Sequence, residues 1–442
     1  MRHATVSIAV AALALSGAAL FQAGPASAGD APAAEWIKFF GGETMSSISS
    51  VAPTADGGLV AAGLSLPKGA QAEGYGSPYD VSLMKLGAGG AVEFASALIS
   101  MNDSLNRDAS VAVTSDGGYV VAGTVAEPKI DLKGLALGGD DAFVARLDPS
   151  GKTLWLKTYG GSDYDKASSV VEGPDGGFLL TGATRSREAG TGCGFDRLEF
   201  APWAALLDSD GNLVGASCRG FGFDAKNAFS AWAPGRDAVF VAGDTGAGSA
   251  TNVVAGTFGP GPQFKGFRRI LGDGGSWNVT GVLGLGDGGL AAAGFRQDVL
   301  SDDSGKHRGF LAAFGPDLEL LWQRQLEKWP VSYLFSLSGT KGGYVAAGAY
   351  VTAANLRDYV FDAFVVLADA EGNAYSELAL SGSGADSATA AAELSGGGMA
   401  VAGYTESLDG DFSSRKGKVL PGDEGRRGAF VMRLPAPAPP GR

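Results

Sequence analysis

A short phrase returns seven times along the chain: a turn, an apolar run, and then a small residue followed by glycine. The copies are spaced by about 51 to 61 residues, a period typical of propellers and repeat arrays. The seven copies end at Ala62-Gly63, Ala122-Gly123, Thr181-Gly182, Ala242-Gly243, Ala293-Gly294, Ala347-Gly348 and Ala402-Gly403. This period constrains the architecture of the chain far more tightly than its function.

Each copy divides into four strand-like segments, and the third copy is the clearest. Thr153–Tyr159 alternates apolar and polar residues, and residues 167–171 form a second short run. Asp175-Gly176-Gly177 is a hairpin signal that leads directly into 178–182. A longer polar loop then reaches the apolar segment 203–207. The unit therefore has four short strands, joined by two tight turns and two wider loops.

Seven units of this kind predict an all-β fold, a seven-bladed β-propeller with four antiparallel strands per blade over residues 34–434. A parallel β-helix is the structural alternative, but its rungs are shorter and lack four strands separated by hairpin signals. Trp36–Gly42 has the pattern of a fourth strand with no first three before it, and Phe430–Leu434 is a third strand with no fourth after it. We expect these two segments to pair, so that the N-terminal strand closes the last blade. The small residue and glycine of each phrase are expected where neighbouring blades crowd together.

The two ends of the chain predict segments outside the propeller. Residues 1–28 have the pattern of a signal peptide, with an uncharged apolar stretch and a small-x-small cleavage site at Ala28. An N-terminal anchor helix is the alternative; no later stretch has the roughly 20 apolar residues of a membrane span. The mature chain is therefore expected in the periplasm or outside the cell. Residues 435–442 are rich in proline and are expected to form a disordered tail.

Charge and cysteine content narrow the classes of partner and compartment. The formal net charge is −13 and the chain has no basic tract, which argues against nucleic-acid binding because phosphate contacts need clustered Lys and Arg. We expect a monomer. Cys193 and Cys218 are the two cysteines of the chain, and in an oxidising compartment they are expected to form a disulfide. Two unpaired buried thiols are the alternative.

The segment 147–162, which reads LDPSGKTLWLKTYGGS, continues to the phrase at 175–182 and resembles the bacterial SBBP-type β-propeller repeat. The resemblance covers about Ala34 to Leu434, although the fourth and fifth copies are degraded. It implies a propeller of the kind found in secreted and cell-surface proteins. It implies no particular activity.

The wider loops that follow the second and fourth strands are expected on one face, and the tight turns on the other. Because variable loops on a rigid scaffold usually carry binding sites, we expect a ligand on the loop-bearing face near the central channel. The ligand would be a protein or a carbohydrate; solvated loops without a specific partner are the alternative. The variable loops are 64–79, 124–140, 183–199, 295–307, 349–361 and 404–427.

The sequence contains no recognisable catalytic constellation. After signal removal His307 is the remaining histidine, and in a polar loop it is expected to be solvated, while no Gly-x-Ser-x-Gly elbow occurs. We therefore predict no catalytic residues and a binding or surface-interaction module. The alternative is a carboxylate-dependent glycoside hydrolase or polysaccharide lyase, which needs only Asp and Glu. A quinone-dependent dehydrogenase and an envelope scaffold component are further alternatives.

Several acidic and aromatic residues have competing interpretations. Asp409 and Asp411 are candidate calcium ligands, because carboxylates alternate with a turn glycine in this loop. The similar segment 208–212 is expected to be a plain hairpin turn. Two repeated sets are expected to be structural, one capping loop amides and the other packing between strands. These sets are Asp80, Asp141 and Asp362, and Trp36, Trp155 and Trp322.

Overall fold

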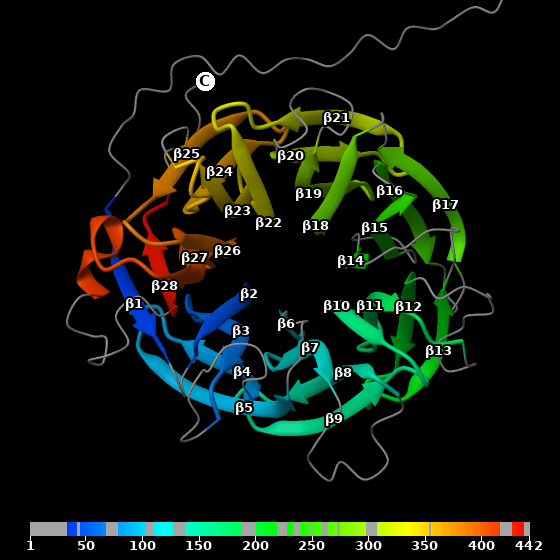
Figure 1. The fold of residues 1–442 in the computed structure, drawn as a ribbon. Coiled ribbons are helices and arrows are strands. Elements are labelled where there is room, and N and C mark those ends of the chain that lie inside the picture. The colour runs from blue at the N-terminus through cyan, green and yellow to red at the C-terminus, as the bar shows by residue number, and fades with distance from the viewer. Residues whose placement is uncertain are drawn as a thin grey trace, which may run out of the picture.

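The computed structural model describes most of the chain as a ring of β-sheets (Figure 1). Within the described residues there are seven four-stranded sheets, in which neighbouring strands are antiparallel. Six blades each use four consecutive strands, and the seventh takes its fourth strand from the N-terminus. The described residues are 33–41, 45–67, 78–102, 109–126, 138–187, 200–218, 228–232, 239–247, 250–258, 264–271, 275–297, 307–352, 355–415 and 427–436.

The first strand of each blade is innermost and the fourth is outermost. Blade 1 contains β2 (Ser47–Pro53), β3 (Leu59–Ser65), β4 (Pro78–Leu86) and β5 (Val92–Asn102). Blade 2 contains β6 (Ala109–Val113), β7 (Tyr119–Ala126), β8 (Asp140–Leu147) and β9 (Thr153–Tyr159). Blade 3 contains β10 (Asp165–Glu172), β11 (Phe178–Thr184), β12 (Ala201–Leu207) and β13 (Leu213–Cys218). Blade 4 contains β14 (Ala228–Trp232), β15 (Val239–Ala247), β16 (Ala250–Phe258) and β17 (Phe264–Leu271).

The remaining three blades complete the ring. Blade 5 contains β18 (Ser276–Gly284), β19 (Leu290–Gln297), β20 (His307–Phe314) and β21 (Leu320–Gln325). Blade 6 contains β22 (Val331–Thr340), β23 (Gly343–Val351), β24 (Asp362–Asp369) and β25 (Ala374–Leu380). Blade 7 contains β26 (Asp386–Glu393), β27 (Met399–Thr405), β28 (Gly428–Leu434) and β1 (Trp36–Phe40), with the short 3-10 helix η2 (Gly410–Arg415) between β27 and β28.

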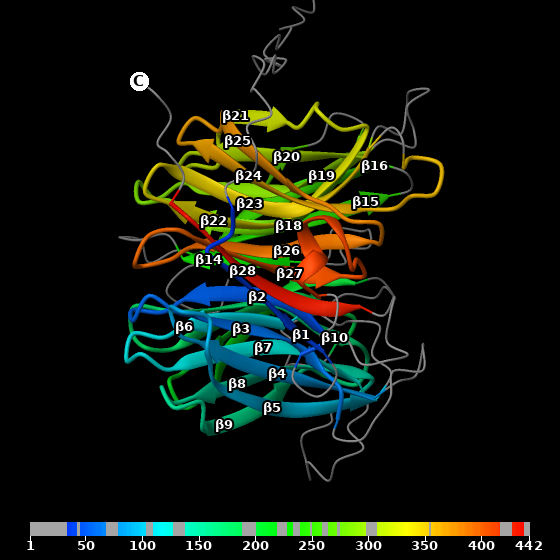
Figure 2. The ribbon, with the colours of Figure 1, turned by 90° about the vertical axis from the view of Figure 1, so that its left-hand side faces the viewer.

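The N-terminal strand closes the ring, as the sequence predicts. β1 pairs antiparallel with β28, and the register runs from Trp36 opposite Arg433 to Phe40 opposite Ala429 (Figures 1 and 2). The expected all-β propeller with its N-terminal latch is therefore confirmed. Residues 1–28, the predicted signal peptide, and residues 437–442 of the predicted tail lie outside the described residues. In the part of the chain that the structure describes, no helix has the length and apolar character needed to cross a membrane.

The hydrophobic core lies between adjacent blades. One cluster, for example, joins Val60 and Leu83 of blade 1 to Val121 and Phe143 of blade 2, and all four side chains are buried. The second strands β3 and β11 are buried at every position, because each is covered by a neighbouring blade on both faces. Sheet faces that pack on both sides explain why these strands consist of small and apolar residues.

The repeated glycine fits against the first strand of its own blade. A Cβ at Gly182 would collide with the backbone oxygen of Lys166, and one at Gly403 would collide with that of Ser387. The crowding expected from neighbouring blades therefore arises within the blade. It occurs beside a β-bulge, where one residue of the first strand is skipped in the pairing with the second strand, next to the repeated glycine.

The bulged residue ties one blade to the next. Thr280 Oγ1 in β18 donates a hydrogen bond to Leu334 O in β22, at 2.7 Å. Thr389 Oγ1 in β26 donates one to Ile48 O in β2, at 2.5 Å, and thereby links the last blade to the first. A bulge re-aims a side chain out of the sheet, and in this ring it directs a hydroxyl across the blade interface.

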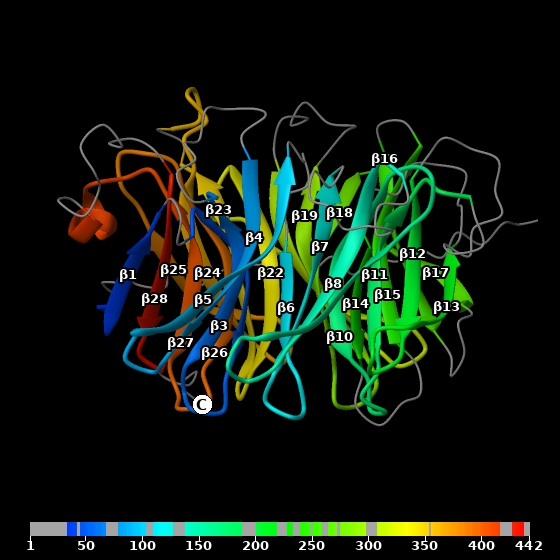
Figure 3. The same ribbon diagram turned by 90° about the horizontal axis from the view of Figure 1, so that it is seen from below.

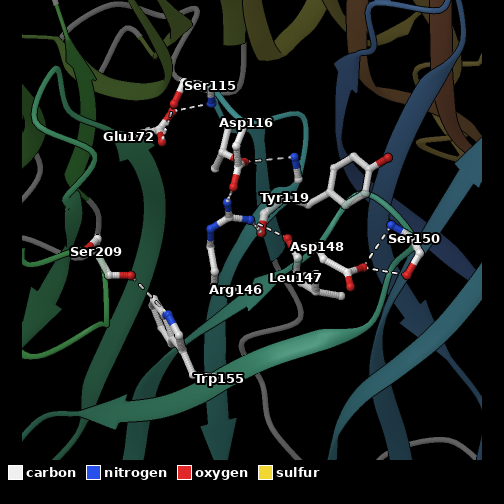
Figure 4. Close-up of polar contacts among 12 residues, drawn as sticks. Ser115, Asp116, Tyr119, Arg146, Leu147, Asp148, Ser150, Trp155, Glu172 and Ser209 are labelled. Carbon is white, nitrogen blue, oxygen red and sulfur yellow. Dashed lines mark hydrogen bonds and ion pairs between the residues drawn. The ribbon is translucent and has the colours of Figure 1, made fainter.

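Figure 3 shows the ring edge-on. Tight turns occupy one of its two faces, which we call the turn face. The opposite face, reached by the connections after the second and fourth strands, is called the loop face. On the turn face Arg146 Nη2 contacts Asp116 Oδ2 at 2.6 Å, and the side chain of Trp155 donates to Ser209 O of the next blade at 3.2 Å (Figure 4). Trp36 makes the same contact with Ala88 O at 3.1 Å. The Trp322 ring lies against Gly372 in a turn of the next blade, so the predicted packing role of these tryptophans is confirmed.

Candidate functional site

Two positions on the innermost strand of blade 6 depart from the repeat. In five blades one residue of the first strand is bulged, meaning that it is skipped in the pairing with the second strand. The two positions compared are this bulged residue and the residue two places before it. Four blades place polar residues at this pair of positions: Ser47 and Ser49, Lys166 and Ser168, Asn278 and Thr280, and Ser387 and Thr389. Blade 6 places Tyr333 and Phe335 there, and both are half-buried. An aromatic pair found in one of these five blades is a candidate for function.

These two rings belong to a larger aromatic group, which we call the Tyr333 cluster. Tyr333 lies between blades 5 and 6, with its ring centroid 4.8 Å from Phe295, 5.1 Å from His307 and 5.7 Å from Phe361. The cluster consists of Phe295, His307, Tyr333, Phe335, Tyr359 and Phe361.

Five of the six residues of the Tyr333 cluster lie toward the loop face. Phe295 is near the end of β19, His307 begins β20, and Tyr333 is near the start of β22. Tyr359 and Phe361 belong to the connection between β23 and β24. Second strands end on this face, and first and third strands start there, so the topology brings five of the rings to it, while Phe335 lies near the middle of β22.

Tyr359 has an unusual backbone. Its φ is 53°, in the left-handed region that residues with bulky side chains rarely adopt. The residue is 45% exposed to solvent. Its N–H donates to Asn355 O at 2.9 Å, which holds the turn in place. Strained residues of this kind concentrate at functional sites, because the surrounding structure must maintain them.

The cluster has little net charge. Burial raises the pKa of Tyr333 to about 12, so its phenol is neutral and its hydroxyl can donate a hydrogen bond. Arg308, beside His307, pairs with Glu327 at 3.3 Å. His307 was expected in a solvated loop; it instead begins a strand, is half-buried and stacks on Tyr333.

A buried carboxylate pair lies beside the cluster at the junction of blades 6 and 7. Asp386 is fully buried and accepts hydrogen bonds from Thr405 Oγ1 at 2.5 Å and Ser407 Oγ at 2.8 Å. Asp362 is 3% exposed and accepts the backbone N–H of Gly382, as expected of a residue that caps loop amides. Burial raises the pKa of Asp362, and it raises that of Asp386 to about 6 with a smaller contribution from Asp362.

The junction of blades 2 and 3 contains the same arrangement. Asp141 and Asp165 are fully buried, and Asp165 Oδ2 accepts from Ser186 Oγ at 2.7 Å. Both carboxylates border Gly160, at 2.6 Å from the position that a Cβ would take. The carboxylate pair is thus a repeated structural element, whereas the aromatic cluster is not. Asp80, the third member of the predicted capping set, accepts from Ser100 Oγ at 2.5 Å.

The candidate calcium residues are tied to the backbone of a neighbouring loop. Asp409 Oδ1 accepts from the N–H of Ser383, and Asp411 Oδ2 from that of Ser381, both at 2.8 Å. Among the described residues, no three His, Cys, Asp or Glu side chains gather as a metal site would require. Calcium binding at Asp409 and Asp411 stays a prediction. Segment 208–212 is a hairpin turn, in which Asp208 Oδ1 accepts from the N–H groups of Asp210 and Asn212.

The predicted disulfide is described on one side. Cys218 ends β13 and is disulfide-bonded, but Cys193 lies outside the described residues. The Cys193–Cys218 pairing therefore stays a prediction. Most residues of the variable loops also lie outside the described part of the chain, apart from segments such as 355–361 and 405–415.

Sequence reasoning did not find the Tyr333 cluster. Aligning the first strands on the glycine of each phrase places Tyr333 opposite apolar residues such as Ile48 and Ala167, because the first strand of blade 6 lies one residue nearer its glycine; only the strand register reveals the departure. The contacts with Phe295 and His307 had no sequence signal either, because they cross between blades.

Comparison with known proteins supports the fold alone. No protein-family model and no curated protein matches the sequence. Among solved structures, the hydrazine synthase of Kuenenia stuttgartiensis aligns with a TM-score of 0.50 and 12% identity, over 81% of this chain and 93% of that chain. The polysaccharide lyase Uly1 aligns with a TM-score of 0.46 and 9% identity, over 88% and 90%. A protein of unknown function from Bacteroides caccae aligns with a TM-score of 0.37 and 12% identity, over 67% and 95%. The likeness to the hydrazine synthase is in the fold alone, and none of the three assigns a family.

Proposed function

We propose that the chain is a secreted, non-catalytic binding module that takes a carbohydrate at the Tyr333 cluster. The observation that carries the proposal is the replacement of a repeated polar pair by Tyr333 and Phe335 on the innermost strand of blade 6. The exposed ring of Tyr359, held on a left-handed backbone, extends this aromatic surface toward solvent.

The chemistry of the cluster favours a carbohydrate over a protein partner. Aromatic faces stack on the C–H face of a sugar ring, and the tyrosine hydroxyls offer hydrogen bonds to its hydroxyl groups. The paired charges of Arg308 and Glu327 leave no strong field that would select a charged ligand. A neutral sugar therefore fits this surface better than a charged peptide.

The test compares two exposed tyrosines on the same face. Tyr359 is 45% exposed in the cluster, and Tyr164 is 44% exposed in the connection between β9 and β10, remote from it in the ring. Asn tolerates the left-handed backbone, so Tyr359→Asn removes the ring without new strain. On a printed array of neutral, amino and acidic oligosaccharides, we expect the unmodified chain and Tyr164→Asn to bind neutral sugars, and Tyr359→Asn to bind them about tenfold or more weakly.

The proposal fails if no oligosaccharide binds, or if both variants bind like the unmodified chain. A thermal melt of each variant separates lost binding from lost folding. If no glycan binds, but the chain retains a protein from a lysate and Tyr359→Asn abolishes that retention, the partner is a protein and not a carbohydrate.

The enzymatic alternative has less support. A glycoside hydrolase or lyase needs two carboxylates that reach substrate, whereas Asp362 and Asp386 are buried and have counterparts in Asp141 and Asp165. No observation therefore favours catalysis, but the same array sugars would reveal it through release of new chain ends. The resemblance to SBBP-type repeats, export after removal of 1–28 and a monomeric state belong to the same proposal.

A further inference from the structure

The carboxylate pair at the junction of blades 6 and 7 is directly connected to the Tyr333 cluster. The backbone N–H of Asp386 donates to Phe361 O at 2.8 Å, across the two blades. Phe361 immediately precedes Asp362 and packs against both Tyr333 and Tyr359. The position of this ring therefore depends on how closely blade 7 approaches the start of β24.

Where blade 7 approaches the start of β24, the carboxyl groups of Asp362 and Asp386 lie in buried surroundings that do not balance two negative charges. Asp362 Oδ1 has no hydrogen-bond partner among the described residues, although the side chain is 97% buried. The hydroxyl donors on Asp386 come from Thr405 and Ser407, which carry no charge. Buried like charges of this kind favour retention of a proton.

The groups on the elements packed around the pair do not remove this excess of negative charge. From η2, Asp411 adds a further negative charge that acts on Asp362. From β23, Tyr350 contributes a neutral phenol, since burial raises its pKa to about 12. The guanidinium of Arg415 in η2 donates to the backbone oxygen of Ser407 at 3.3 Å.

We infer that protonation of the Asp362–Asp386 pair controls the Tyr333 cluster, by holding Phe361 against blade 7 when the pair carries a proton and releasing it when both groups are ionised. The inference rests on the proposed binding function. It assigns a regulatory role to a repeated structural element at the one described junction where that element adjoins the aromatic rings. At the junction of blades 2 and 3, Asp140 occupies the position of Phe361, so the residue that precedes the equivalent Asp141 is not aromatic.

The sign of the effect follows from the pKa of Asp386. This pKa is raised from 3.8 to about 6 in the folded chain, so the closed junction binds a proton that the open junction releases. Closure is consequently favoured below pH 4 and weakens as the pH rises from about 4 to about 6. Between pH 5 and pH 7.5 the opening equilibrium should increase by about tenfold.

Amide hydrogen exchange of the full chain tests this without any ligand. Peptides covering 355–361 should lose about tenfold in protection between pH 5 and pH 7.5, after correction for intrinsic exchange rates. Asp386→Asn should abolish this change, while the matched Asp165→Asn, which removes the equivalent carboxylate at the other junction, should leave it intact. If Asp386→Asn does not fold, Asp362→Asn makes the same test.

Three results would overturn the inference: protection that does not change with pH, a change that persists in Asp386→Asn, or a change produced by calcium and reversed by EDTA at constant pH. Loss of sugar binding in the array with the exchange profile unaltered would instead contradict the proposed function alone, so the two failures are distinguishable.

Discussion

At the scale of single residues, the repeated glycine is tightly constrained in the five blades for which its surroundings are described. Its side-chain space is filled by the backbone of the bulged first strand, and backbone atoms cannot move aside as a flexible side chain can. The bulge and the glycine therefore form one unit, and the glycine is needed for close approach rather than for a left-handed φ. The sequence shows the glycine seven times but does not show what it contacts.

We predict that Gly182→Ala destabilises the fold by about 1–3 kcal/mol, because its Cβ would push against Lys166 O and separate β10 from β11. Gly286→Ala is the matched control, since a Cβ there meets no atom within 4 Å. Urea denaturation of both variants measures the difference in the free energy of unfolding. Equal midpoints for the two variants would show that the bulge relaxes freely.

At the scale of the element, the fourth strand does two things: it ends one blade and its aromatic residue packs on the following blade. Trp155 packs on Gly211 and Trp36 on Gly90, in each case at a glycine with positive φ in the next turn between third and fourth strands. Periodicity predicted the strands, their order and the unpaired fourth strand at the N-terminus. It could not predict contacts between blades, which is why Tyr333, a residue defined by its neighbours in blade 5, was not found.

The two tryptophans allow a matched comparison. Both are half-buried, so Trp36→Ala and Trp155→Ala should each cost about 2 kcal/mol of stability. β1 differs from the other fourth strands because no turn connects it to the third strand of its blade; its partner β28 comes from the other end of the chain. Limited proteolysis should therefore release the N-terminal segment early in Trp36→Ala and not in Trp155→Ala. Identical fragment patterns would contradict this distinction.

At the scale of the whole molecule, stability depends on closure of the ring. Each blade buries its apolar faces against two neighbours, so an open ring would expose one face of blade 7 and one of blade 1. The core cluster at this seam joins Leu59 and Met84 of blade 1 to Ala402 and Val431 of blade 7. Thr389 and Arg433 add hydrogen bonds across the seam, to Ile48 O and Ala88 O.

A chain that begins after Phe40 should therefore lose more than the contacts of one short strand. Without β1, the hydrogen-bonding edge of β28 is exposed, and exposed edges of apolar strands promote self-association. We expect this shortened chain to elute as oligomers in size-exclusion chromatography, and a synthetic peptide of residues 33–41 to restore the monomeric elution volume. The same peptide with Lys38→Pro should fail, because Lys38 lies opposite Val431 at the centre of the pairing and proline cannot donate a backbone hydrogen bond. A shortened chain that stays monomeric and melts at the original temperature would mean that the seam between blades 7 and 1 closes the ring by side-chain packing alone.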